Sequence, residues 1–229
     1  MIILAIDCSA SLCAACVYHA HQDREAGIEM GREVRDLGKG HAEHLMAVID
    51  AALEKAGKDF ADLNRIAVSV GPGSFTGVRV GVSTARGLAL ALNIPAFGVN
   101  TLEALAAEAA KDFPEKEIFA LLDGGRGEIH TALFDARHNL LFGPAAISPE
   151  EAVRLAVENN AVLAGAAAQN IADTAAAGLD VVLPKATADI ATYARLATLK
   201  DAGEKPRPLY LREADAKPQA GFVLPRTGS

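Results

Sequence analysis

The order of strands and helices predicted for this chain occurs twice, and this repeat constrains the fold more than any single motif. A continuous apolar run, Ile2–Ile6, ends at Asp7 and precedes two further strand patterns and a helical one. A second apolar run, Ile118–Leu122, ends at Asp123 and opens the same series again. Hairpins of strands followed by crossover helices are typical of mixed sheets. The chain is therefore predicted to form two similar halves.

Two such halves facing each other form the architecture of actin, sugar kinases and heat-shock ATPases. The expected fold class is α/β, actin-like (ribonuclease H-like), with two lobes of order βββαβα. In the first half, strands are expected at Ile2–Ile6, Ala14–Tyr18, Gly27–Val34, Ile66–Val70 and Pro95–Val99, and helices at His41–Ala56, Val78–Leu92 and Thr101–Lys111. In the second half, strands are expected at Ile118–Leu122, Glu128–Phe134, Leu140–Phe142 and Val162–Ala164, and helices after Ser148, at Ala167–Ala177 and at Ile190–Ala202.

These elements divide the chain into three expected segments. Residues 1–104 form an N-terminal lobe that binds a partner, and residues 105–203 form a C-terminal lobe. Residues 204–229 form an extension or tail, with a final strand at Leu209–Arg212 and loop or disorder from Pro218 onward.

Composition limits the kinds of partner. The 229 residues are 51% hydrophobic, enough for a sizeable core, and the net charge of −7 disfavours direct binding to nucleic acid phosphates. A nucleic acid would therefore be reached only through a partner. The chain has no apolar run of about 18 residues and no basic region before its first apolar stretch. These features predict a cytoplasmic protein without a membrane segment.

Two short patterns resemble metal or redox sites only weakly. Cys13 and Cys16 have the spacing of a redox pair, but they fall in a predicted strand, where residues three apart point to opposite faces. The three cysteines, Cys8 included, are therefore expected to be free and buried. His41 and His44 lie three apart on a predicted helix and lack a clear third ligand, so no metal site is expected.

A strand, a glycine-rich loop and a helix follow one another over residues 69–90, which read SVGPGSFTGVRVGVSTARGLAL. Because helix starts attract anions and glycines allow close approach, one interpretation is a nucleotide or anion site. The loop lacks the lysine of a phosphate-binding loop, since Val78 and Arg79 follow Gly77. The other interpretation is a tight strand-to-helix connection. The candidate contacts are Asp7, Ser9, Gly71, Gly73, Ser74, Thr76, Gly77 and Arg79.

Asp7 and Asp123 occupy corresponding positions, because each ends the first strand of its half. In kinase-like architectures, acids at these positions manage magnesium and the attacking water. Aspartates at strand ends also commonly form turns, so both interpretations stay open here.

The two helices predicted at His41–Ala56 and Val78–Leu92 carry more apolar surface than one sheet can cover. The surplus predicts either a second chain or the other lobe packed against them. The residues expected at a partner interface are Leu45, Met46, Ile49, Leu53, Val78, Val82, Ala85, Leu88 and Leu92.

The chain contains the stretches IILAIDCSA, GHAEHLMAVIDAAL, SVGPGSFTGVRVGVSTARGLALALNIPAFGVNTLEALA and RPLYLREADAK. In these stretches it closely resembles the TsaB (YeaZ) family. The similarity is dense in the first half, looser in the second, and returns in the C-terminal LYLR segment.

The resemblance implies an actin-like fold and a part in bacterial synthesis of N6-threonylcarbamoyladenosine in tRNA. It implies a non-catalytic subunit that supports the catalytic subunit TsaD, pairing through helices His41–Ala56 and Val78–Leu92. TsaD holds its metal with two histidines four residues apart, a pattern absent here. No catalytic residue and no required cofactor are therefore expected, and ADP or ATP at a shared subunit interface stays open. Further implied partners are the ATPase TsaE and the synthase TsaC, with tRNA contacted only through the complex. Because of the surplus apolar surface, a homodimer of the chain alone stays open beside a monomer.

Two other functions stay open as alternatives: a nucleotide-binding enzyme of the kinase-like class and a glycoprotease-type peptidase.

The family usually has Asp-Thr-Ser after the first strand and Asp-Ala-Arg after the first strand of the second half. This chain has Asp7-Cys8-Ser9 and Asp123-Gly124-Gly125-Arg126 instead.

Overall fold

The first half of the chain builds a five-stranded mixed sheet in the order β3-β2-β1-β4-β5. β1 pairs with β2 in antiparallel and with β4 in parallel orientation, so it lies at the centre and is apolar on both faces. Its residues Leu4 and Ile6 pack against outer helices, whereas Ile3 and Ala5 pack toward the second half. The strands are β1 (Ile2–Asp7), β2 (Leu12–His19), β3 (Ile28–Asp36), β4 (Arg65–Ser69) and β5 (Ala96–Val99).

The second half repeats this topology, since its sheet has the order β10-β9-β6-β7-β8. β6 takes the place of β1, with an antiparallel β7 on one side and a parallel β9 on the other. The strands are β6 (Ile118–Gly125), β7 (Glu128–Phe134), β8 (Leu140–Ile147), β9 (Val162–Ala164) and β10 (Val181–Val182). Each half therefore has the expected order βββαβα, extended by one further strand and helix.

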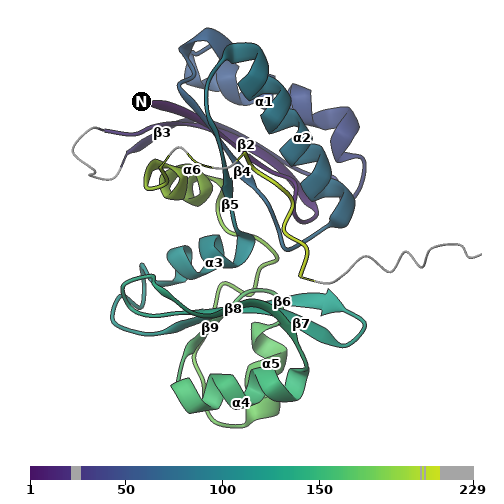
Figure 1. The fold of residues 1–229 in the computed structure, drawn as a ribbon, viewed down its shortest axis with the longest axis vertical. Helices are drawn as coiled ribbons and strands as arrows, with labels where there is room; N and C mark the ends of the chain where they lie inside the picture. The colour runs from purple at the N-terminus through teal and green to yellow at the C-terminus, as the bar shows by residue number, and fades with distance from the viewer. Residues whose placement is uncertain (22–26, 202, 204, 212–229) are drawn as a thin grey trace, which may run out of the picture.

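Figure 1 shows five layers in which helices and sheets alternate in this computed structural model, which describes residues 1–21, 27–201, 203 and 205–211. Two helices cover the outer face of each sheet, and two lie between the sheets. The outer helices are α1 (His41–Ala56) and α2 (Phe75–Leu92) on the first sheet, and α4 (Pro149–Asn159) and α5 (Ala168–Ala175) on the second. The fold is the actin-like, two-lobed α/β fold that the repeat predicts.

Each of the two inner helices packs against the sheet of the lobe other than the one that it follows in sequence. α3 (Thr101–Ala109) follows the first sheet in sequence but packs against β6 and β7. α6 (Ile190–Thr198) follows the second sheet but packs against β1, β2 and β4. The predicted boundaries, 1–104 and 105–203, follow chain order, whereas the packing joins α6 to the first lobe. One apolar core fills the central layer and includes residues of both sheets.

Several boundaries differ from the prediction for local reasons. α2 begins at Phe75, earlier than predicted, because Ser74 Oγ accepts from the Gly77 amide at 3.2 Å and caps it. α3 begins at Thr101 as predicted, where Asn100 caps it through a 2.8 Å bond from the Leu102 amide, and it ends at Ala109 instead of Lys111. β10 is too short to show a hydrophobic period, and the short 3₁₀ helix Phe60–Asp62 carries no such signal either.

The C-terminal segment follows the first lobe without joining a sheet. The predicted strand is wrong for Leu209–Leu211, although the Leu209 amide donates to the Val70 carbonyl at 2.7 Å. The last residue of the predicted strand, Arg212, and the tail predicted from Pro218 onward lie outside the described residues.

Candidate functional site

The glycine-rich loop between β4 and α2 packs directly against the turn that follows β1. A β-carbon on Gly73 would overlap the carbonyl oxygen of Ser9, and one on Gly77 would overlap that of Cys8. The amide of Ser74 donates to the same Ser9 oxygen at 2.7 Å. Because only glycine permits such an approach, the loop is a tight connection between strand and helix, as the second interpretation holds.

Asp7, at the end of β1, is sealed inside the molecule with 1% of its surface exposed. Its Oδ1 accepts hydrogen bonds from the Ser9 amide at 2.8 Å and from the Ser69 hydroxyl. Its Oδ2 accepts from the Thr187 hydroxyl at 2.6 Å. A carboxylate removed from water needs such donors, since burial otherwise penalises its charge. Three donors from three separate segments replace hydration here.

Tyr193 of α6 extends this polar cluster. Its hydroxyl lies 2.6 Å from Thr187 Oγ1, and because the Thr187 proton is donated to Asp7, Tyr193 donates to Thr187. Burial of the ring and the nearby Asp7 charge raise the pKa of Tyr193, so it keeps its proton. The sequence singles out none of these hydroxyl residues. The sequence offers one indication, a polar residue, Ser69, at the end of an otherwise apolar predicted strand.

The eight predicted nucleotide or anion contacts fall into two groups. The buried ones are Asp7, Ser9, Gly71 and Gly77, and the exposed ones, around the start of α2, are Gly73, Ser74, Thr76 and Arg79. The structure does not bring all eight to one surface, and anion contact stays a prediction. Asp123, which the sequence pairs with Asp7, does not end its strand as predicted, because β6 runs on to Gly125. It is exposed, and its Oδ1 accepts from the Gly125 amide at 2.7 Å.

Arg79 already has partners within the chain. Its Nε donates to the Tyr210 hydroxyl at 2.7 Å, and its guanidinium carbon lies 3.6 Å from the centre of the Phe75 ring. The centres of the Phe75 and Tyr210 rings are 5.5 Å apart. Through this cation–π arrangement, the cation predicted to meet an anion holds the C-terminal segment against the start of α2.

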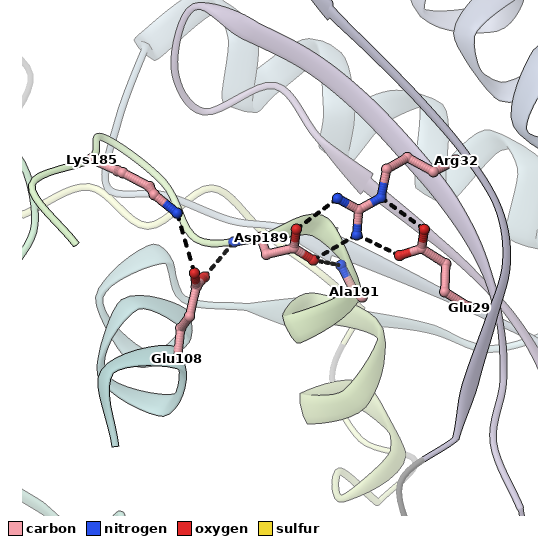
Figure 2. A network of polar contacts seen from close by, with 6 residues as sticks. All are labelled: Glu29, Arg32, Glu108, Lys185, Asp189 and Ala191. Atoms are coloured by element: carbon pink, nitrogen blue, oxygen red, sulfur yellow. Dashed lines mark hydrogen bonds and ion pairs between the residues drawn. The ribbon is translucent and has the colours of Figure 1, made fainter. Parts of the chain in front are cut away.

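A second polar network joins β3 to the two inner helices (Figure 2). Arg32 donates to both oxygens of Asp189, at 2.7 and 2.8 Å, and also to Glu29. The Asp189 amide donates to Glu108 of α3, whose other oxygen lies 3.3 Å from Lys185 Nζ. This bidentate pairing ties the start of α6 to the first sheet and to a helix of the second lobe.

The charge of Asp189 depends on this network. Burial alone would raise its pKa, but the hydrogen bonds from Arg32 and the Ala191 amide, together with the Arg32 charge, hold the pKa below its ordinary value. The folded state thus favours the ionised form more than the unfolded state does. The stability gained is present above the unfolded pKa and is lost as pH falls through the folded pKa.

Replacing Asp189 with asparagine is expected to lower the free energy of unfolding at pH 7 by roughly 1 kcal/mol, since partly exposed pairs are screened by solvent. Asparagine still caps α6, so the change removes mainly the charge. The difference between variant and wild type should shrink once the pH falls below about 3.9, the ordinary aspartate pKa, and vanish only below the lower pKa of the folded state. Urea denaturation of both proteins across this range would measure it, and a difference that stays constant would contradict the assignment.

Most residues predicted at a partner interface face the chain's own core. The buried ones, which pack between the first sheet and its outer helices, are Leu45, Ile49, Leu53, Val78, Val82 and Ala85. Leu88 and Leu92 are partly buried against the same core, and Met46 is exposed. A buried side chain cannot touch a partner, so the available surface is the opposite face of α1 and α2. The interface itself stays a prediction.

The described part of the chain holds no group of three histidine, cysteine or acidic side chains that could bind a metal ion. As expected, Cys8, Cys13 and Cys16 are free and buried, with the Cys8 and Cys13 sulfurs 4.0 Å apart. Burial raises the pKa of the Cys16 thiol. Among the described residues, no helix combines the length and apolar character needed to cross a membrane.

Comparison with known proteins adds family relationships to this geometry. The family model described as TsaD, tRNA N6-adenosine threonylcarbamoyltransferase, matches residues 35–220. The chain is 32% identical over 141 residues to the tRNA threonylcarbamoyladenosine biosynthesis protein TsaB of Buchnera aphidicola subsp. Schizaphis graminum (strain Sg). This match covers 62% of the chain and 64% of that protein, so the chain spans less than two thirds of this relative.

Two other proteins match along nearly the whole chain. An uncharacterized protein of Mycobacterium tuberculosis (strain ATCC 25618 / H37Rv) is 30% identical over 221 residues, which are 95% of each chain. A crystal structure from Pseudomonas aeruginosa, described as an uncharacterized protein with similarity to peptidase YEAZ, superposes with a TM-score of 0.75 at 23% identity. That superposition covers 92% of this chain and 99% of the other, and it supports the fold.

Proposed function

Because this chain belongs to the TsaB (YeaZ) family, we propose that it is a non-catalytic partner subunit of the complex that forms N6-threonylcarbamoyladenosine in tRNA. In this role it pairs with a TsaD-like catalytic subunit, and a TsaE-like ATPase and a TsaC-like synthase are further partners. It reaches tRNA only through the complex. The role requires no cofactor of its own, and it places the chain in the cytoplasm.

The observation that carries this proposal is the outer face of α1 and α2. The two helices lie side by side on the face of the first sheet that is turned away from the second lobe (Figure 1). This face exposes large apolar side chains, with Met46 45% and Leu90 81% exposed. Between them α2 presents small residues such as Gly87, where an added β-carbon would meet nothing within 4 Å. A helical face that presents exposed apolar side chains and small residues among charged ones suits close packing against helices of another chain.

Replacing Gly87 with glutamate is expected to weaken pairing with the TsaD-like subunit by at least about tenfold, or about 1.4 kcal/mol. The open space around Gly87 admits the side chain, and glutamate favours a helix more than glycine does. In the complex, however, its charge would be buried in an apolar contact. Titration of the two purified subunits, followed by light scattering or calorimetry, measures the affinity.

Two variants serve as controls for this experiment. Gly87→Ala adds only a methyl group without charge and should weaken pairing much less than Gly87→Glu does. Val157→Glu places the same charge on α4 of the other lobe, at a side chain that is 45% exposed, and should also leave pairing intact. If folded Gly87→Glu pairs with wild-type affinity, the outer face of α1 and α2 is not the interface.

The role itself is tested by reconstitution. Purified chain, the TsaD-like, TsaE-like and TsaC-like proteins, tRNA, threonine, bicarbonate and ATP should yield modified tRNA, detected by mass spectrometry, only when this chain is present. The chain alone should neither hydrolyse ATP nor cleave peptides, because Asp7, the acid that a kinase-like enzyme would use, is buried among donors. A robust rate of ATP hydrolysis or peptide cleavage by the purified wild-type chain alone would overturn the non-catalytic role.

A further inference from the structure

Within its described residues, the chain crosses between the two lobes at two places. The first crossing is at Asn100, between β5 of the first sheet and α3 on the second. The second crossing, residues 183–189, runs from β10 of the second sheet to α6 on the first. Any relative motion of the lobes must move these crossings. The contacts that hold each crossing in place therefore decide whether the two lobes can move apart.

The middle of the second crossing is anchored by the polar cluster around Asp7. Thr187 donates to Asp7 Oδ2 at 2.6 Å and accepts from Tyr193, so its hydroxyl is used on both sides. Both partners belong to the first lobe by packing, and all three side chains are buried. Pulling Thr187 away would leave a buried carboxylate oxygen without its donor, which is costly.

The end of the second crossing is anchored by the network in Figure 2. Arg32 of β3 holds the Asp189 carboxylate with two hydrogen bonds, and the Asp189 amide donates to Glu108 of α3. Lys185, within the crossing, pairs with the same glutamate. One residue of the crossing is thus bound both to the first sheet and to a helix of the second lobe.

We propose that Thr187 and Asp189 form an interlobe lock, which holds the second crossing against both lobes and keeps the Asp7 carboxylate sealed inside a closed molecule. Asp7 lies at the end of β1, where an acid could face a ligand. In the interlobe lock it instead accepts the hydrogen bond from Thr187 that holds the second crossing in place. The two lobes then move as one rigid body. The lock stands on the contacts within this chain and does not depend on the proposed partner role.

Hydrogen exchange of backbone amides in the full chain, measured by nuclear magnetic resonance, tests the lock. The Asp189 amide is the reporter, because its acceptor lies on the second lobe. Thr187→Val keeps the shape of the side chain and removes the hydroxyl. It is expected to speed exchange at Asp189 at least tenfold, while amides within α1 and α4 exchange as in the wild type.

Thr192→Val is the matched control. Thr192 is a buried threonine of α6 whose Oγ1 has no hydrogen-bond partner, so the substitution should leave exchange at Asp189 unchanged. Arg32→Gln breaks the other anchor and should also speed exchange at Asp189, which keeps the test available if Thr187→Val does not fold. Unchanged exchange at Asp189 in both anchor variants would overturn the lock. A uniform acceleration across all helices would overturn it too, since it would assign Thr187 to the cooperative core.

Discussion

Replacing Gly77 with alanine is expected to lower the free energy of unfolding by about 3 kcal/mol or more, because overpacking against backbone cannot be relieved by a rotamer change. The new β-carbon would overlap the carbonyl oxygen of Cys8, which is held in place by the central strand β1. Relief would require α2 to move away from the sheet that it covers. Denaturation with guanidinium, followed by circular dichroism, would measure the loss.

Gly87→Ala is the control, since the same substitution in the same helix meets nothing within 4 Å. It should stabilise the chain by about 0.5–1 kcal/mol, the difference in helix propensity between alanine and glycine. If both variants had equal stability, the close approach of the loop to the turn after β1 would be wrong.

Replacing Asp7 with alanine is expected to destabilise the chain by roughly 3 kcal/mol or more, because each buried donor left without an acceptor costs about 1–3 kcal/mol. The substitution removes the acceptor of the Ser9 amide, the Ser69 hydroxyl and the Thr187 hydroxyl together. It also leaves a cavity at the end of β1. Thermal and chemical unfolding of the purified variant would measure the effect.

Asp123→Ala is the matched control, because the sequence places Asp123 as it places Asp7, at the expected end of the first strand of its half, although β6 runs on to Gly125. Asp123 is exposed, and its side chain accepts a hydrogen bond from the nearby Gly125 amide. Its loss should change the free energy of unfolding by no more than about 0.5 kcal/mol, as is usual for surface positions. Equal losses for Asp7 and Asp123 would mean that the buried cluster contributes nothing beyond a turn.

The sequence predicts the elements well where the signal is local. α1 is predicted to the residue, since its apolar stripe is regular and Gly57 ends it in a left-handed conformation. The continuous apolar runs of β1 and β6 identify central strands covered on both faces. Short or irregular elements such as β10 escape, because two residues cannot display a period.

The candidate site is less predictable, because periodicity identifies apolar residues without saying which layer covers them. Ile49 and Val82 are apolar enough for an interface, yet the first sheet buries both, and Leu90 carries the exposed surface instead. The sequence likewise identifies the glycines of the loop. The sequence does not show that Gly73 and Gly77 approach the turn after β1, because this approach depends on which segment lies opposite the loop in the folded chain.

By itself, the sequence determined that this chain has two similar α/β halves, a glycine-rich loop between a strand and a helix, and helices rich in apolar residues, because each of these follows from neighbouring residues. Only the tertiary structure decided the difference between Asp7 and Asp123, which look alike in sequence. Asp7 meets Ser69 and Thr187, which lie 62 and 180 positions away, because α6 returns to the first lobe. No local sequence pattern predicts that α6 packs on the first lobe. This packing depends on which sheet face remains uncovered when the chain folds.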